Sequence, residues 1–124
     1  MRMESDAAKQ PVTVGERYLE GFLQVPANAR GLVVFAHGAG SSHLSKRNNH
    51  VAEALGAHGL ATLLFDLLTE VESYDRANVF DIGLLSRRMS EAVTWARGRA
   101  EVAGLPIGLF GASTGAAAAL VAAA

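Results

Sequence analysis

The chain has 124 residues, a formal net charge of −1 at pH 7 and no cysteine. This charge gives no general electrostatic basis for binding nucleic acid or anionic membranes, and the missing cysteine excludes disulfides, thiolate metal sites and a cysteine nucleophile. No run of about 18 apolar residues occurs, so no segment is expected to span a membrane. Residues 1–10 lack the apolar core of a signal peptide, so they are expected to be a disordered lead-in to a cytoplasmic protein.

The first elements are predicted to be β-strands. Alternating apolar and polar residues in Pro11–Gly15 and Tyr18–Val25 predict a hairpin at one edge of a sheet, turning at 15–17. Gly31–Ala36 and Leu60–Phe65 are continuously apolar, which is typical of strands buried on both faces of a parallel sheet.

Two helices and a loop are predicted between and after these strands. The first helix is expected to be capped by Asn48 or Asn49 and to end at Gly59. Its apolar face would carry Val51, Ala54, Leu55 and His58. The polar, acidic segment 67–78 is predicted to be a loop.

A longer amphipathic helix is expected from Asn78 or Asp81 up to a stop at Gly104. Its apolar face would carry Ile82, Leu85, Met89, Val93 and Ala96, with Arg87, Arg88, Glu91, Arg97 and Arg99 mostly on the opposite face. Leu105 and Pro106 then lead into a third apolar strand. Strands that alternate with helices in this way predict an α/β fold, with a parallel sheet between two helical layers.

The segment Gly111-Ala112-Ser113-Thr114-Gly115 joins this third strand to an alanine-rich helix. It matches G-x-S-x-G, the nucleophile elbow of serine hydrolases, in which two glycines leave room for a sharply turned serine. The helix beginning after Ser113 directs its positive dipole end toward the turn, which favours a developing oxyanion. A strand-to-helix turn that merely uses glycines is the alternative interpretation.

The loop His37–Ser42 follows the first buried strand and contains His-Gly-x-Gly. Such a turn supplies a backbone N–H to an oxyanion hole. We predict the N–H groups of Ala39 and Thr114 as the donor pair, with Gly40 as the substitute for Ala39. A structural glycine turn and a phosphate-binding turn are the alternatives, but His43 breaks the G-x-G-x-x-G pattern. Candidate substrate contacts are Gly40, Ser41 and His43.

Three segments together resemble the α/β-hydrolase superfamily, of the dienelactone-hydrolase-like kind: Val33–Ser42, Ala61–Glu70 and Phe110–Gly115. The resemblance implies a three-layer α/β sandwich with a mostly parallel sheet over residues 11–124. It also implies esterase-like acyl transfer from Ser113 to a small-molecule ester, without metal or cofactor. Dienelactone hydrolases proper have a cysteine at this position, which leaves the substrate open. The middle segment resembles bacterial members that are sometimes fused to, or mislabelled as, phosphoribosyltransferases, but we find no acidic ribose-binding loop here.

The acid and histidine of the triad should follow the serine in this fold, and no such residue follows Ser113 in this sequence. We therefore expect a domain truncated after the nucleophile helix. His37 is expected to be structural, and His50 and His58 to be surface or packing residues. Asp66, at the carboxyl end of a strand, is expected to make a turn or cap hydrogen bond, with an acid in the site as the alternative. A non-catalytic remnant, which acts through assembly or interaction, is the alternative function. The third strand would be an open sheet edge, through which the chain is expected to self-associate.

Overall fold

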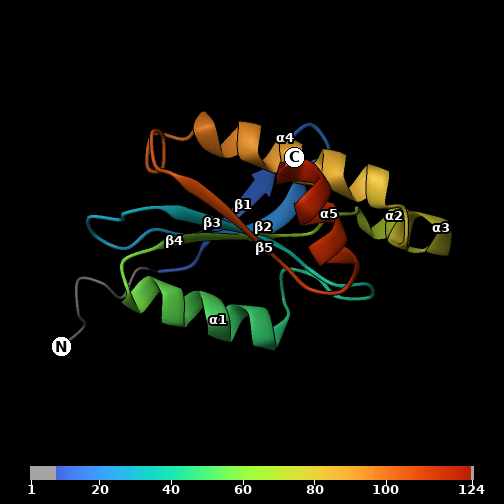
Figure 1. Cartoon of the computed structure of the whole chain (residues 1–124), viewed down its shortest axis with the longest axis horizontal. Coiled ribbons are helices and arrows are strands. Elements are labelled where there is room, and N and C mark those ends of the chain that lie inside the picture. Colours follow the sequence, from blue (N-terminus) through green and yellow to red (C-terminus); the bar gives the residue numbers. More distant parts are fainter. Residues whose placement is uncertain (1–7, 124) are drawn as a thin grey trace.

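The computed structural model describes residues 8–123, which form a five-stranded sheet with helices on both faces (Figure 1). Most of the expected lead-in, residues 1–7, lies outside the described residues, and Gln10 already belongs to the first strand. The elements in chain order are β1 (Gln10–Val14), β2 (Leu19–Gln24), β3 (Leu32–Ala36), α1 (Lys46–Ala57), β4 (Ala61–Phe65), α2 (Glu70–Ser73), α3 (Arg76–Val79), α4 (Ile82–Arg97), β5 (Ile107–Gly111) and α5 (Thr114–Ala123).

The sheet has the strand order β1-β2-β4-β3-β5. Strand β3 pairs in parallel with both β4 and β5, so that Leu32 lies opposite Ala61 on one side and Ile107 on the other. Strand β2 is antiparallel to β1 and β4, so four of the five strands share one direction. The three apolar strands are therefore adjacent and parallel as expected, and their carboxyl ends meet at one edge of the sheet.

The molecule has three layers, as the sequence predicted. Helix α1 packs against β4 on one face of the sheet, and α4 and α5 lie together on the other (Figure 1). Alternate side chains of β3 point to opposite faces of the sheet and pack into two different cores. Val34 and Ala36 belong to the larger core, with α4 and α5. Phe35 packs with Leu64 and Ala52 beneath α1. This alternation explains why the strand is apolar throughout.

Helix α1 begins earlier than predicted. Ser45, rather than Asn48 or Asn49, is the N-cap, and its Oγ accepts a hydrogen bond from the Asn48 N–H at 3.2 Å. Its buried face also differs, because Ala52 and Gly56 are buried while Ala54 and His58 are exposed. The helix ends at Ala57 with His58 as its C-cap, and Gly59, the predicted stop, follows with a φ of +84° that suits glycine.

The segment predicted as a loop, 67–78, contains helix α2 and the first part of α3. Thr69 and Glu72 form a capping box: the Thr69 Oγ1 accepts from the Glu72 N–H, and the Glu72 carboxylate accepts from the Thr69 N–H. This T-x-x-E pattern was the available sequence signal. The acidic composition of the segment concealed it.

Helix α4 begins after Asp81 as expected, but it ends at Arg97 rather than at Gly104. Gly104, with a φ of +81°, lies in the turn before β5. Leu85, Met89 and Ala96 are buried as predicted, and Ile82 and Val93 are half-buried. The prediction for one arginine is wrong, because Arg88 is only 2% exposed.

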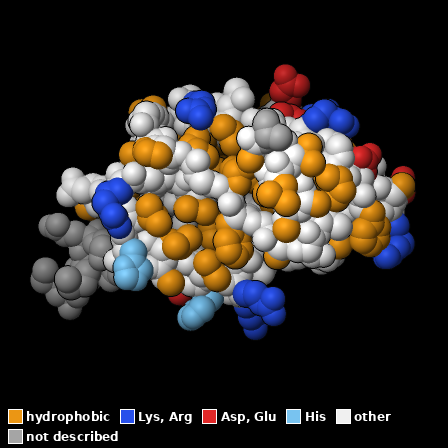
Figure 2. Space-filling model, in the orientation of Figure 1, with side chains coloured by type: hydrophobic (Ala, Val, Ile, Leu, Met, Phe, Trp, Pro, Cys, Tyr) orange, Lys and Arg blue, Asp and Glu red, His pale blue; other side chains and the backbone are white. Residues whose placement is uncertain are grey.

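None of the helices in the described part of the chain is long and apolar enough to cross a membrane. Figure 2 shows apolar side chains grouped on the face where β5 and α5 lie in Figure 1. The large exposed ones on these two elements are Phe110, Leu120 and Val121.

Candidate active site

Ser113 lies at the sharp turn between β5 and α5. Its φ is +58°, in the left-handed region that side-chain-bearing residues rarely adopt. The Ala116 N–H donates to the Ser113 carbonyl at 3.0 Å, so the helix begins at once. The serine side chain is exposed. A strained, exposed serine between a strand and a helix is the geometry of a nucleophile elbow.

The two glycines that flank this serine allow the turn to close. A Cβ added to Gly111 would lie 2.5 Å from the Gly115 carbonyl oxygen. A Cβ on Gly115 would lie 2.2 Å from the carbonyl oxygen of Ala36, at the end of β3. These neighbours are backbone atoms, which cannot rotate away. Both positions therefore require glycine, as the pattern predicted.

The glycine turn after β3 packs directly against the elbow. A Cβ on Gly38 would lie 3.2 Å from the Cβ of Ser113 and 3.3 Å from the Ala112 carbonyl oxygen. The Ser41 N–H donates to the Gly38 carbonyl at 3.1 Å and closes a four-residue turn. Gly40 is the third residue of that turn and has a φ of +74°, the conformation that a type II turn requires there. The structure thus places the turn that contains Ala39 next to Ser113.

His37 connects this turn to the end of β4. The Leu67 N–H donates to His37 Nε2 at 2.9 Å, so Nε2 must be the unprotonated ring nitrogen. Nδ1 then carries the proton and donates to the Gly38 carbonyl at 2.8 Å. Burial lowers the pKa of His37 below its ordinary value of 6.5, which favours this neutral form. Both ring nitrogens are engaged, so His37 has a structural role and is not available as a general base.

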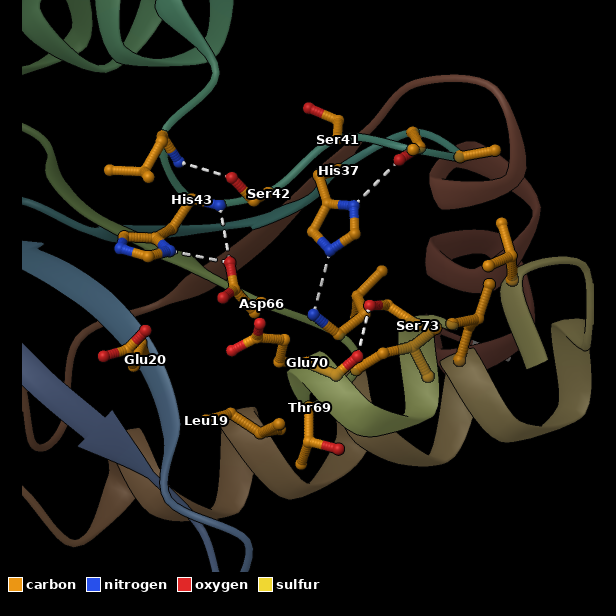
Figure 3. Close-up of a pocket in the computed structure, with 18 of the residues that line it drawn as sticks. Leu19, Glu20, His37, Ser41, Ser42, His43, Asp66, Thr69, Glu70 and Ser73 are labelled. Atoms are coloured by element: carbon orange, nitrogen blue, oxygen red, sulfur yellow. Dashed lines mark hydrogen bonds and ion pairs between the residues drawn. The ribbon is translucent and has the colours of Figure 1, made fainter. Parts of the chain in front are cut away.

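His43 is paired with Asp66, as Figure 3 shows. Asp66 Oδ1 accepts from both the backbone N–H and the ring Nδ1 of His43, each at 2.7 Å. The ring is 10% exposed and makes an edge-to-face contact with Phe22. The Asp66 N–H donates to the Glu20 carbonyl. Asp66 therefore joins the loop after β3 to the end of β4, which matches the hydrogen-bonding role expected from the sequence. His50 and His58, whose roles were left between surface and packing, are both exposed.

A cavity of about 660 Å³ opens at this edge of the sheet (Figure 3). Five of the predicted site residues line it: Ala39, Gly40, Ser41, His43 and Thr114. Its other walls come from the β1–β2 turn with the start of β2, which includes Glu20, and from the segment that runs from the end of β4 into α2, which includes Asp66 and Glu70. Ser113 does not line this cavity, but two of its neighbours do: Thr114, which follows it in the chain, and Gly38, which packs against it. In the described residues, no group of three or more His, Asp or Glu side chains could hold a metal ion.

One group of residues near the site has no clear signal in the sequence. Arg88 of α4 forms two hydrogen bonds with Glu72, at 2.7 and 2.6 Å, and Arg88 Nη1 also donates to the Leu67 carbonyl at 3.1 Å. The guanidinium lowers the pKa of Glu72 from 4.5 to about 2. Helical periodicity could not reveal this cluster, because it placed Arg88 on the solvent side.

Comparison with known proteins gives relatives but no matching family model. The chain is 54% identical over 127 residues to proteins of Mycobacterium tuberculosis strains CDC 1551 / Oshkosh and H37Rv, both named "Putative phosphoribosyl transferase". The match covers 96% of this chain and 29% of each relative. Among solved structures, dienelactone hydrolase from Anabaena variabilis has a TM-score of 0.87 and 49% identity, over 95% of this chain and 56% of that protein.

More distant structures share the fold. The dienelactone hydrolase-like promiscuous phosphotriesterase P91, from metagenomic libraries, has a TM-score of 0.75 at 20% identity. Est1E from Butyrivibrio proteoclasticus has a TM-score of 0.75 at 18% identity. The matches span 53% of P91 and 45% of Est1E.

The fold is thus that of the α/β-hydrolases. More narrowly, its neighbours among solved structures are dienelactone hydrolase-like α/β-hydrolases, and the chain matches about half of that fold.

Proposed function

We propose that this chain forms part of a serine hydrolase that acts on ester-type bonds of small molecules. Ser113 Oγ would attack the acyl carbonyl, and an acyl-enzyme would form as the alcohol leaves. The observation that carries the proposal is the backbone of Ser113, which is held at a φ of +58° by two glycines packed against backbone atoms. Tyr18 and Asn28 also have a positive φ, but among these three residues Ser113 is the one flanked by two glycines that pack against backbone atoms at a strand-to-helix turn.

The proposed oxyanion hole consists of the N–H groups of Ala39 and Thr114, with Gly40 as the substitute for Ala39. Support comes from Gly38, which lies against Ser113, and from the cavity that Ala39 and Thr114 both line. Thr114 is also the first residue of α5, where backbone N–H groups are free of helical partners. Gly40, Ser41 and His43 are proposed substrate contacts on the same wall.

The proposal assigns the general base and its acid to residues outside these 124. His37 has both ring nitrogens in hydrogen bonds, and the His43 ring is only 10% exposed and packs against Phe22. The chain spans 29% of the length of its curated relatives and 56% of the Anabaena hydrolase. A serine without a base is a weak nucleophile, so full activity is proposed only for the longer protein.

Two other functions are weaker. The name of the mycobacterial relatives suggests phosphoribosyl transfer, but this sequence has no acidic ribose-binding loop followed by small phosphate-binding residues. A non-catalytic module that acts through assembly is favoured by one observation. Within the described residues, β5 pairs with β3 alone and forms an edge of the sheet.

A fluorophosphonate probe tests the nucleophile directly. We expect slow covalent labelling of the wild type at Ser113, mapped by peptide mass spectrometry, because an oxyanion hole and binding leave a residual rate without the base. We expect no labelling of Ser113→Ala. Ser90→Ala is the matched control, because Ser90 is an exposed serine on α4 that does not line this cavity, and its labelling should equal that of the wild type. Equal labelling of the wild type and Ser113→Ala would reject Ser113 as the nucleophile. A folded wild-type chain that resists the probe would favour the non-catalytic module.

A further inference from the structure

Arg88 is a buried cation outside the cavity lining. It projects from α4, is 2% exposed, and is held by the carboxylate of Glu72. A buried arginine is costly unless its donors are satisfied. Part of its hydrogen-bonding capacity is directed at a backbone carbonyl, that of Leu67. Helix packing alone does not explain this contact, since an apolar side chain would fill the same space at a lower desolvation cost.

Leu67 is the link between Arg88 and the candidate oxyanion turn. Its carbonyl accepts from Arg88 Nη1 at 3.1 Å, and its N–H donates to His37 Nε2 at 2.9 Å. His37 Nδ1 in turn donates to the Gly38 carbonyl at 2.8 Å. That carbonyl also accepts the Ser41 N–H, which closes the turn around Ala39 and Gly40. Figure 3 shows the His37 ring between the Ser41 loop and the α2 region.

We propose that Arg88, held by Glu72, is a positioning residue that sets the oxyanion turn through Leu67 and His37. This inference rests on the proposed hydrolase function, because it gives the turn a catalytic purpose. Arg88 fixes the Leu67 backbone, and the Leu67 N–H then fixes the tautomer of His37. The protonated Nδ1 of that tautomer holds the Gly38 carbonyl and so orients the N–H groups beyond it.

The alternative is that Arg88 only stabilises the fold, and the two roles differ in what they do to His37. If Arg88 sets the turn, its loss releases the Leu67 backbone, and the imidazole no longer has a fixed donor at Nε2. The ring should then populate both neutral tautomers. A purely stabilising arginine would lower the free energy of unfolding and leave the His37 tautomer unchanged in the folded state.

The test compares Arg88→Met with Arg87→Met, its exposed neighbour on α4. Long-range ¹H–¹⁵N NMR of the His37 imidazole is expected to show the Nδ1–H tautomer in the wild type and in Arg87→Met. A tautomer mixture is expected in Arg88→Met, together with shifted amide signals at residues 38–41. The labelling rate of Ser113 by the fluorophosphonate should fall about tenfold in Arg88→Met, since small misplacements of oxyanion donors are costly.

Glu72→Gln keeps the test decisive if Arg88→Met does not fold. This variant retains Arg88 but weakens its hydrogen bonds to residue 72. The His37 imidazole signals and the amide signals of residues 38–41 should therefore shift less than in Arg88→Met. Wild-type imidazole and amide signals in either folded variant would overturn the proposal. If the wild type resists labelling, the nucleophile proposal fails, and the His37 signals still decide whether Arg88 acts on the turn.

Discussion

Gly115 lies directly against the carbonyl of Ala36, where a Cβ would come within 2.2 Å of the oxygen. The first turn of α5 is thereby pressed onto the end of β3. This contact joins the two segments that carry the candidate nucleophile and the candidate oxyanion turn. The relative placement of the two loops therefore depends on the absence of one side chain.

We expect Gly115→Ala to destabilise the protein by roughly 3 kcal/mol or more, because the added methyl meets backbone atoms that cannot move aside. Gly108→Ala in β5 is the control, since its Cβ would meet nothing within 4 Å. It should change the free energy of unfolding by less than about 0.5 kcal/mol. Urea unfolding followed by circular dichroism measures both, and similar values for the two variants would contradict the packing described here.

Protonation of His37 should weaken the fold in mildly acidic solution. Burial lowers the pKa of His37 below 6.5, so the unfolded chain binds the proton more readily. The contribution of neutral His37 to stability is thus complete above pH 6.5, and it is lost as the pH falls through 6.5 toward the lower folded pKa. His37→Gln should lose about 1 kcal/mol at pH 7.5 and show a flatter pH dependence.

Urea unfolding at pH 7.5, 6.5 and 5.5 measures this dependence. His50→Gln is the control, since His50 is exposed on α1, and it should keep the wild-type slope. A wild-type slope in His37→Gln would show that another group causes the effect.

The Glu72–Arg88 pair should give a second loss of stability at lower pH. Hydrogen bonding to Arg88 lowers the pKa of Glu72 from 4.5 to about 2. The stabilisation is therefore fully present above pH 4.5 and disappears as the pH falls from 4.5 toward 2. Glu72→Gln should cost roughly 1 to 3 kcal/mol at pH 7, and the difference from the wild type should shrink across that window. Glu53→Gln, on the exposed side of α1, should show no such convergence in thermal unfolding scans.

We propose that the open edge at β5 makes this chain self-associate. Within residues 8–123, β5 has β3 as its one neighbouring strand, and Phe110 on β5 is 38% exposed. An edge strand with unpaired backbone groups favours pairing with another chain, and lysine on such a strand opposes it. Gly108→Lys should therefore shift the population toward monomer in sedimentation velocity runs over a concentration series. Ala54→Lys adds the same charge on the exposed side of α1 and should behave as wild type. A wild-type chain that is monomeric throughout the series would rule out this association.

Much of the fold followed from local patterns in the sequence. Continuous apolar runs identified β3 and β4 as strands buried on both faces, because each face of the sheet is covered by a helix. The glycines at 111 and 115 identified the elbow, because only a residue without a side chain allows so close an approach. The assignment of Ser113, Ala39 and Thr114 to catalysis stays a prediction, although the structure brings their loops together.

The sequence by itself determined the order of the strands and of the three longer helices along the chain, the parallel centre of the sheet and the turn at Ser113, since these depend on neighbouring residues and on hydrophobic period. Only the tertiary structure decided where Arg88 lies. Helical periodicity placed it in solvent, but Glu72 and the Leu67 carbonyl satisfy its charge and donors within the protein. The tertiary structure also decides the tautomer of His37, because the N–H of Leu67, 30 residues away in the chain, donates to its Nε2. Such pairings arise from contacts between distant segments, which no local pattern encodes.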